Sequence, residues 1–101
     1  MIPEAGPPIN RALICFKKAA NQGQPVAQHH LAFMYAEGWT GAFDAVKAFQ
    51  WFTLALRQPD WVRAYDAKLD SRQARDRLIT KMSGYQIKRG EDAAKVWLAR
   101  R

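Results

Sequence analysis

Little in this sequence of 101 residues supports a disulfide, a membrane span or a secretory signal. Cys15 is the single cysteine, so no disulfide can form within the chain. No apolar run reaches about 18 residues, the length that a membrane-spanning helix needs. The first residues contain neither the basic nor the apolar segment of a secretory signal. We therefore expect a cytoplasmic protein, or a periplasmic one if this chain is a processed fragment.

Side chains that could perform chemistry are equally scarce. His29 and His30 are adjacent, and neighbouring residues of a helix point about 100° apart, so the two rings cannot bind one metal ion together. Cys15 has no flanking motif of a reactive thiol, and we expect it to be a small buried hydrophobic residue. No nucleophile, base and orienting group stand at a spacing that would assemble a catalytic site. We predict no enzymatic activity, no metal site and no cofactor.

What the sequence does contain suits one globular domain with a basic second half. Hydrophobic residues make up 49% of the chain, which is enough for one core. The net charge is +7, of which residues 1–50 contribute +1 and residues 51–101 contribute +6. A basic half attracts nucleic acid, acidic protein or an anionic surface, but it is also what a solvated helical face looks like.

The spacing of apolar residues predicts an all-α fold, because they recur every three or four positions and no strand pattern competes. Glycine, proline, serine and aspartate residues mark the helix ends. The prediction is a Pro-rich extended arm over residues 1–8 and about five helices, at residues 9–22, 25–37, 44–58, 61–82 and from 83 onward. Gly90 predicts a kink or break in the last helix.

An internal repeat is visible in the first half of the chain. Ala12, Phe16 and Ala19 recur 36 residues later as Ala48, Phe52 and Ala55. A period of this size is typical of α-solenoids, in which each helix pair covers the apolar face of the next.

A longer pattern surrounds these residues. Its members are Ala12, Leu13, Phe16, Ala19, Ala20, Gln22, Gly23, Ala27, Gln28, Leu31, Met34, Tyr35, Gly38, Asp44, Ala48, Trp51 and Phe52. The pattern resembles the Sel-one-like repeat of the tetratricopeptide-like α-solenoids, although Cys15 stands where that repeat usually has Trp. The resemblance implies one repeat domain over residues 9–101, with a well-matched region at 9–58 and a diverged C-terminal capping repeat at 60–101.

The resemblance also implies where a partner binds. The helix at residues 25–37 is the first of a pair in this family, and its concave face holds ligands. The partner-binding residues expected on the concave face are His29 and Phe33 of this helix and, on the helix expected at 61–82, Tyr65, Leu69 and Arg72. The alternative is that these side chains pack against neighbouring helices. If the helix at 25–37 is the first of a pair, the opening helix at residues 9–22 is the second helix of a repeat whose first helix is absent. We therefore expect either the arm or another chain to cover its apolar side.

The leading functional hypothesis is a non-enzymatic scaffold that binds a protein or peptide partner on the concave face. One alternative is self-association through the opening helix, which gives a homo-oligomer. Another is a nucleic-acid- or anion-binding helical domain. The basic residues that it would use are Arg63, Lys68, Arg72, Arg75, Arg77, Lys81, Lys88 and Arg89. Trp39 is either a cap over the helix ends, which we favour, or an exposed binding residue.

Overall fold

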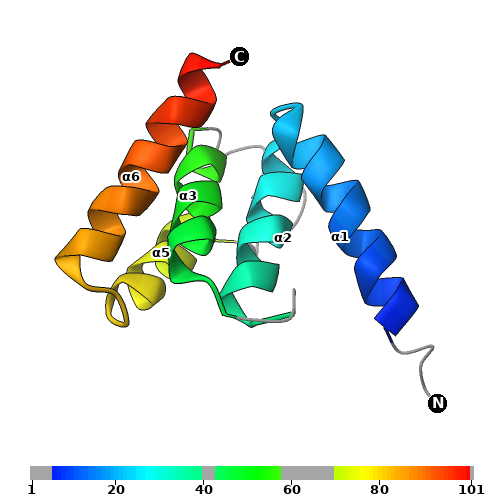
Figure 1. Ribbon diagram of the computed structural model, residues 1–101, viewed down its shortest axis with the longest axis horizontal. Coiled ribbons are helices and arrows are strands. Elements are labelled where there is room, and N and C mark those ends of the chain that lie inside the picture. Colours follow the sequence, from blue (N-terminus) through cyan, green and yellow to red (C-terminus); the bar gives the residue numbers. More distant parts are fainter. Residues whose placement is uncertain (1–5, 40–42, 58–69, 101) are drawn as a thin grey trace.

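The computed structural model describes residues 6–39, 43–57 and 70–100 (Figure 1). These residues contain five α-helices and no strand, which confirms the predicted all-α fold. The helices are α1 (Gly6–Asn21), α2 (Pro25–Ala36), α3 (Ala45–Ala55), α5 (Ser71–Ile79) and α6 (Gly84–Ala99). None of these described helices has the length and apolar character that a membrane crossing requires.

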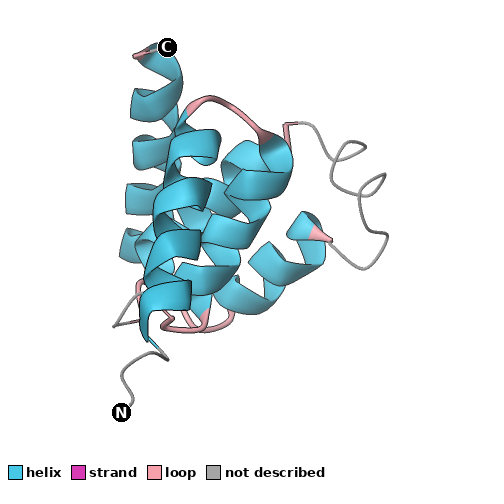
Figure 2. Cartoon of the chain, turned by 90° about the vertical axis from the view of Figure 1, so that its right-hand side faces the viewer, coloured by secondary structure: helices cyan, strands magenta, loops and turns pink. Residues whose placement is uncertain are grey.

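The helices lie in two layers. α1, α3 and α6 form one layer, and α2 and α5 form the other, so α5 and α6 lie on opposite sides of the molecule (Figures 1 and 2). α2 packs against α1 and α3, while α3 also packs against α5 and α6. α2 also touches α5, more weakly. α2 and α3 are therefore the central helices, and α1 stands at the open end of the stack.

Four helix ends, at Gly23, Gly38, Asp44 and Ser83, form where the sequence predicts them. Gly23 and Gly38 end α1 and α2 with φ of 93° and 76°, a backbone conformation that residues with a Cβ rarely adopt. Asp44 caps α3 by accepting a hydrogen bond from the Lys47 amide at 3.0 Å. Ser83 opens α6 with the predicted capping box, in which Gln86 bonds back to the Ser83 amide. These caps fix the short turn between α1 and α2 and the direction in which α3 and α6 leave their loops.

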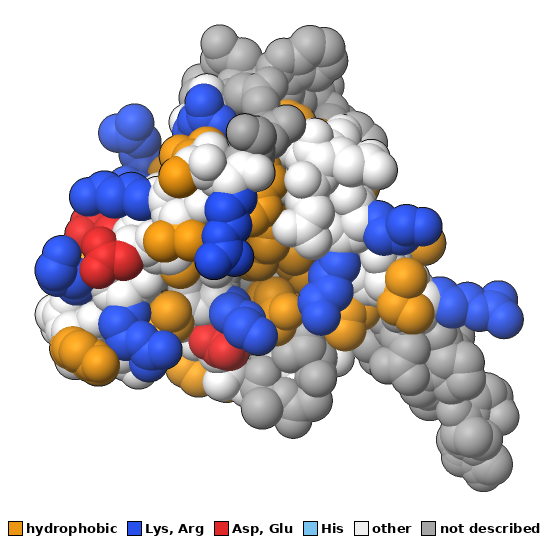
Figure 3. Space-filling view, turned by 45° about the horizontal axis from the view of Figure 1, so that its top comes forward, with side chains coloured by type: hydrophobic (Ala, Val, Ile, Leu, Met, Phe, Trp, Pro, Cys, Tyr) orange, Lys and Arg blue, Asp and Glu red, His pale blue; other side chains and the backbone are white. Residues whose placement is uncertain are grey.

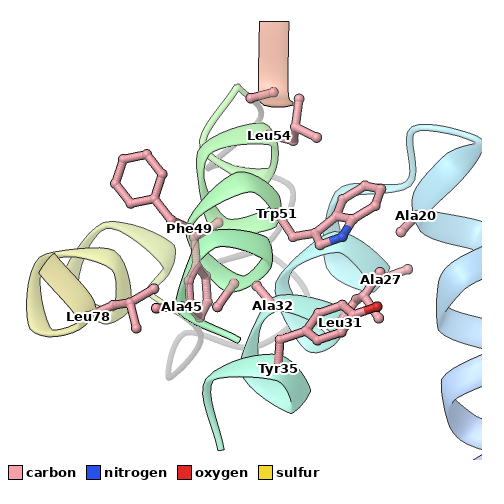
Figure 4. Close-up of a cluster of buried hydrophobic side chains, with 13 residues drawn as sticks. Ala20, Ala27, Leu31, Ala32, Tyr35, Ala45, Phe49, Trp51, Leu54 and Leu78 are labelled. Atoms are coloured by element: carbon pink, nitrogen blue, oxygen red, sulfur yellow. The ribbon is translucent and has the colours of Figure 1, made fainter. Parts of the chain in front are cut away.

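The core is centred on α3 (Figure 4). Phe52 is 1% exposed, and Leu31 of α2 and Leu78 of α5 are also buried. Trp51 extends from α3 towards Ala20 of α1 (Figure 4). The Trp51 ring also meets the ring of Trp97 of α6 edge to face, with centroids 5.9 Å apart. Side chains from all five described helices thus pack around α3.

Some apolar residues of α2 and α3 recur at the same spacing in α5 and α6. Ala27 and Leu31 of α2 recur 47 residues later as Ala74 and Leu78 of α5. Ala48, Trp51 and Phe52 of α3 recur 46 residues later in α6, as Ala94, Trp97 and Leu98. The capping repeat expected over residues 60–101 stays a prediction, because the recurrence is limited to these few positions. α5 and α6 differ from α2 and α3 in packing mainly against α3 rather than against each other.

Two predicted boundaries were wrong. α1 begins at Gly6, so residues 6–8 belong to the helix and not to the arm. Proline is tolerated there because the first turn of a helix leaves its amide groups unbonded. The expected long helix at residues 61–82 is interrupted at Asp70, which has φ −112° and ψ 97° and caps α5. Residues 61–69 lie outside the described residues.

The expected break at Gly90 was also wrong, because α6 runs through this position without interruption. A Cβ atom at Gly90 would lie 2.5 Å from Cδ1 of Phe49, which is far inside a normal contact. Glycine is therefore needed here for its small size, which lets α6 approach α3 closely.

Two apolar residues stand on exposed surfaces, and one of them, Cys15, we predicted to be buried. Cys15 lies on an exposed part of α1, because no described helix covers that side. Val96 of α6 is 49% exposed, although it belongs to the apolar set of its helix. In both cases an apolar residue stands on a surface that the described helices leave uncovered.

Candidate functional site

A groove runs between α2 and α5. It consists of two adjoining cavities of about 450 and 290 Å³, which share Phe33 of α2 and Ala74 and Arg77 of α5. The larger cavity is also lined by His29, His30, Trp39, Asp70 and Gln73. The smaller one is also lined by Ala36, Glu37, Phe52, Leu78 and Lys81. The groove is long enough to take a peptide segment, because its two parts lie one after the other along both helices.

Two exposed aromatic side chains stand at the entrance of the larger cavity. Phe33 is 39% exposed and Trp39 is 54% exposed, and their rings meet edge to face with centroids 5.3 Å apart. The Gly38 turn fixes Trp39 next to α2, where its amide donates to the Met34 carbonyl at 2.9 Å. An exposed aromatic pair beside a cavity is a typical contact point for a hydrophobic side chain of a partner. Trp39 is thus an exposed residue rather than the cap that we favoured.

The floor of the groove is held by a buried hydrogen bond between its two helices. Nδ1 of His29 and Oγ of Ser71 are 2.7 Å apart, and each side chain is 4% exposed. The His29 ring also packs edge to face on Phe52, with centroids 5.4 Å apart. Ser71 does not line the cavity, so its hydroxyl is not placed to attack a molecule bound there. This pair therefore ties α5 to α2.

The environment of His29 keeps its ring neutral at pH 7. Burial lowers the pKa of His29 from 6.5 to about 4, and the neighbouring His30 acts in the same direction while Asp70 opposes it. The two adjacent histidines face different neighbours, since His30 packs against Phe16 of α1 at a centroid distance of 5.1 Å. His30 is half-buried, as expected for a packing residue.

The charged groups along the groove are of both signs. Asp70 and Arg77 line the larger cavity, and Glu37, Arg77 and Lys81 line the smaller one. Asp70 is already engaged as the cap of α5, where its Oδ1 accepts from the Gln73 amide at 3.0 Å. A groove with balanced charge and aromatic walls suits a peptide with a hydrophobic side chain better than it suits a phosphate or another anion.

The structure brings together only part of the predicted site. His29 and Phe33 line the same cavity, but His29 is buried and bonded to Ser71, as our packing alternative predicted. Arg72 is exposed and lines neither cavity. Tyr65 and Leu69 lie outside the described residues.

Sequence reasoning missed the residues that α5 supplies to the groove. Gln73, Ala74 and Arg77 take the place on the cavity wall that we gave to Arg72. The signal was present, because Asp70 stands three residues before Gln73, the spacing of a helix start. With a helix start at Asp70, Ala74 and Leu78 stand one helical turn apart on α5, as Ala27 and Leu31 do on α2. This correspondence indicates which side of α5 faces the core.

Two of the basic residues named for a nucleic-acid surface are engaged by aromatic rings in the described part of the chain. Among the eight that we named, Arg75 is half-buried with its guanidinium 5.8 Å from the Phe49 ring centre. Arg89 lies over the ring of Tyr85 on α6, 5.9 Å from its centre. Arg63 and Lys68 fall outside the described residues. Within the described residues, His, Cys, Asp and Glu form no group of three that could hold a metal ion.

Comparison with known proteins agrees with this architecture. The model of the Sel1 repeat matches residues 6–24 and 25–60, which together make up more than half of the chain. The first match covers α1 and the second covers α2 and α3, so the resemblance inferred from the sequence is confirmed. Searches of curated proteins and of solved structures give no match.

Proposed function

The chain belongs to the Sel1 repeat family, whose repeats mediate protein–protein interaction. We therefore propose that it is a non-catalytic module. It binds a peptide segment of a partner protein in the groove between α2 and α5. A hydrophobic side chain of the partner would contact Phe33 and Trp39. The polar groups of Gln73 and Arg77 would bond to the backbone of the bound segment.

One observation carries this proposal. The exposed aromatic side chains of Phe33 and Trp39 pack against each other and line the 450 Å³ cavity. Exposing Phe33 and Trp39 to water costs free energy that a bound hydrophobic side chain would recover. The rigid floor formed by His29 and Ser71 keeps the groove open before binding, which lowers the entropic cost of association.

The experiment begins with selection of binding peptides from a random library on the immobilised chain. Selected peptides are then measured by fluorescence polarisation against the unmodified chain and two variants, Phe33→Ala and Trp39→Ala. Each variant should weaken binding by about tenfold or more, because both truncations remove an exposed aromatic contact. Circular dichroism checks that helicity is unchanged.

The matched control is Tyr85→Ala. Tyr85 is 74% exposed, so its truncation also removes an exposed aromatic ring, but it lies on α6 in the other layer. Peptides bound in the groove should keep their affinity for this control. Peptides that bind Phe33→Ala and Trp39→Ala as tightly as the unmodified chain would show that the groove is not the binding site.

A further inference from the structure

A second surface lies in the other layer of the molecule, where the C-terminal ends of α1 and α6 approach each other. A hollow of about 620 Å³ opens between them. It is lined by Asn21 of α1, Gln50 of α3, and Ala93, Val96, Trp97 and Arg100 of α6 and its C-terminal end. The hollow shares no lining residue with the groove between α2 and α5. The two sites can therefore be altered separately.

The hollow is closed at one end by a hydrogen bond between distant parts of the chain. Nε1 of Trp97 donates to Oδ1 of Asn21 at 3.0 Å. The Trp97 ring packs against Trp51 beneath it. The indole thus has a fixed position and forms a wall of the hollow.

One exposed apolar side chain, Val96, lines the hollow, and another, Ile14, lies further along α1. Val96 is 49% exposed, and Ala93, Val96 and Arg100 follow one another at spacings of three and four, so they share one side of α6. On α1, Ile14 is 59% exposed and stands seven residues before Asn21, which places it on the same side of that helix. We call the lining residues together with Ile14 the α1–α6 surface.

The charge around this surface is strongly positive. α1 and α6, with Arg100 that caps the end of α6, carry seven basic residues and two acidic ones. Arg100 is the one charged residue among those lining the hollow, and Asp92 of α6 is paired with Lys88 at 3.6 Å. Figure 3 shows Lys and Arg side chains around exposed hydrophobic ones at this end of the molecule.

From this juxtaposition we propose that the α1–α6 surface binds an acidic amphipathic helix of a partner protein. The apolar side of that helix would cover Val96 and Ile14, and its carboxylates would face Arg100 and Lys17. A protein segment fits better than a nucleic acid, because Val96 and Ile14 offer aliphatic contacts and Arg100 is the one charged residue among the described residues lining the hollow, whereas a nucleic acid would need several phosphate contacts. The module would then hold one partner on each layer.

The test uses two synthetic helical peptides with the same apolar side, one with Glu and one with Lys on its polar side. Fluorescence anisotropy measures their binding to the full chain. The acidic peptide should bind at least about tenfold more tightly than the basic one. Val96→Ser and Arg100→Glu should each weaken the acidic peptide by about tenfold. Both positions are exposed, so the fold should tolerate these changes.

Arg72→Glu is the matched control, because it reverses one exposed charge on α5, in the other layer. It should change the affinity by less than about twofold, since surface charges this far apart are largely screened. If Arg72→Glu and Arg100→Glu weaken the affinity equally, the binding is due to general charge attraction, and the proposal is overturned.

Two further results would also overturn it. One is equal binding of the acidic and basic peptides, or no binding of either. The other is tighter binding of a single-stranded oligonucleotide than of the acidic peptide, lost steeply with salt and sensitive to Arg100→Glu. Phe33→Ala should leave the acidic peptide unaffected, so failure here is distinguishable from failure of the groove.

Discussion

α1 and α3 have the same spacing of core residues but different surroundings. Phe52 is 1% exposed and Ala48 is fully buried, whereas their counterparts Phe16 and Ala12 are half-buried. α3 packs against α2, α5 and α6, while α1 packs mainly against α2. Equal sequence patterns thus produce unequal burial, because a helix in a stack is covered only as far as it has neighbours.

The largest expected effect of this difference is on stability. Phe52→Ala should lower the free energy of unfolding by about 3–5 kcal/mol, because it removes a buried ring and leaves a cavity. Phe16→Ala should cost only about 1–2 kcal/mol, because the ring is already partly in water. Urea unfolding followed by circular dichroism measures both. An equal loss of unfolding free energy in the two variants would show that α1 and α3 are covered to the same extent.

The second prediction concerns the two sides of α2, where His29 faces α3 and α5 while His30 faces α1. The folded-state pKa of His29, about 4, lies below its unfolded value of 6.5, so between these values the unfolded chain binds the extra proton. The contribution of His29 to stability should therefore fall as the pH drops from 6.5 to 4, by on the order of 2–3 kcal/mol.

Urea titrations at a series of pH values measure this slope. His29→Gln should remove the part due to His29, and His30→Gln should leave most of it in place. An unchanged slope in His29→Gln would show that His29 is not held neutral by its burial between the helices.

The third prediction uses the close approach of α6 to α3, which α1 lacks. Gly90→Ala should destabilise the fold by about 1–2 kcal/mol, because the added Cβ meets Phe49 and this outweighs the better helix propensity of alanine. Gly84→Ala is the control, since a Cβ at Gly84 would meet no other atom within 4 Å. Its stability should change by less than about 0.5 kcal/mol. A stabilised Gly90→Ala variant would mean that the two helices are further apart.

The helices, their caps and the repeat could be predicted because they depend on neighbours in sequence. The 3.6-residue period placed Ala48 and Phe52 inside, and the Ser83 cap followed from the serine and Gln86 alone. Phe49 and Leu54 are also buried, although neither belongs to the repeated positions or to the family pattern found in the sequence. They are buried because α5 and α6 cover further sides of α3. The spacing of apolar residues within α3 does not predict this coverage by distant helices.

The groove could be predicted only on its α2 side. Phe33 follows from the family pattern, but the opposite wall depends on where α5 begins and how it is rotated. Asp70 has the spacing of a cap, three residues before Gln73, but it lies in a strongly charged segment that we predicted as part of one long helix. The hydrogen bond from the Gln73 amide to its carboxylate identifies it as the cap. Contacts between distant segments, such as His29 with Ser71, cannot be found from spacing alone.

Hydrogen exchange of the backbone amides, resolved by helix, tests most directly the claim that position in the stack sets stability. The amides of α3 should be the slowest to exchange, and those of α1 should exchange about 100-fold faster, because the end helix can open without disrupting the rest. Equal protection of α1 and α3 would contradict the claim, since it would show that the end helix is held as firmly as the central one.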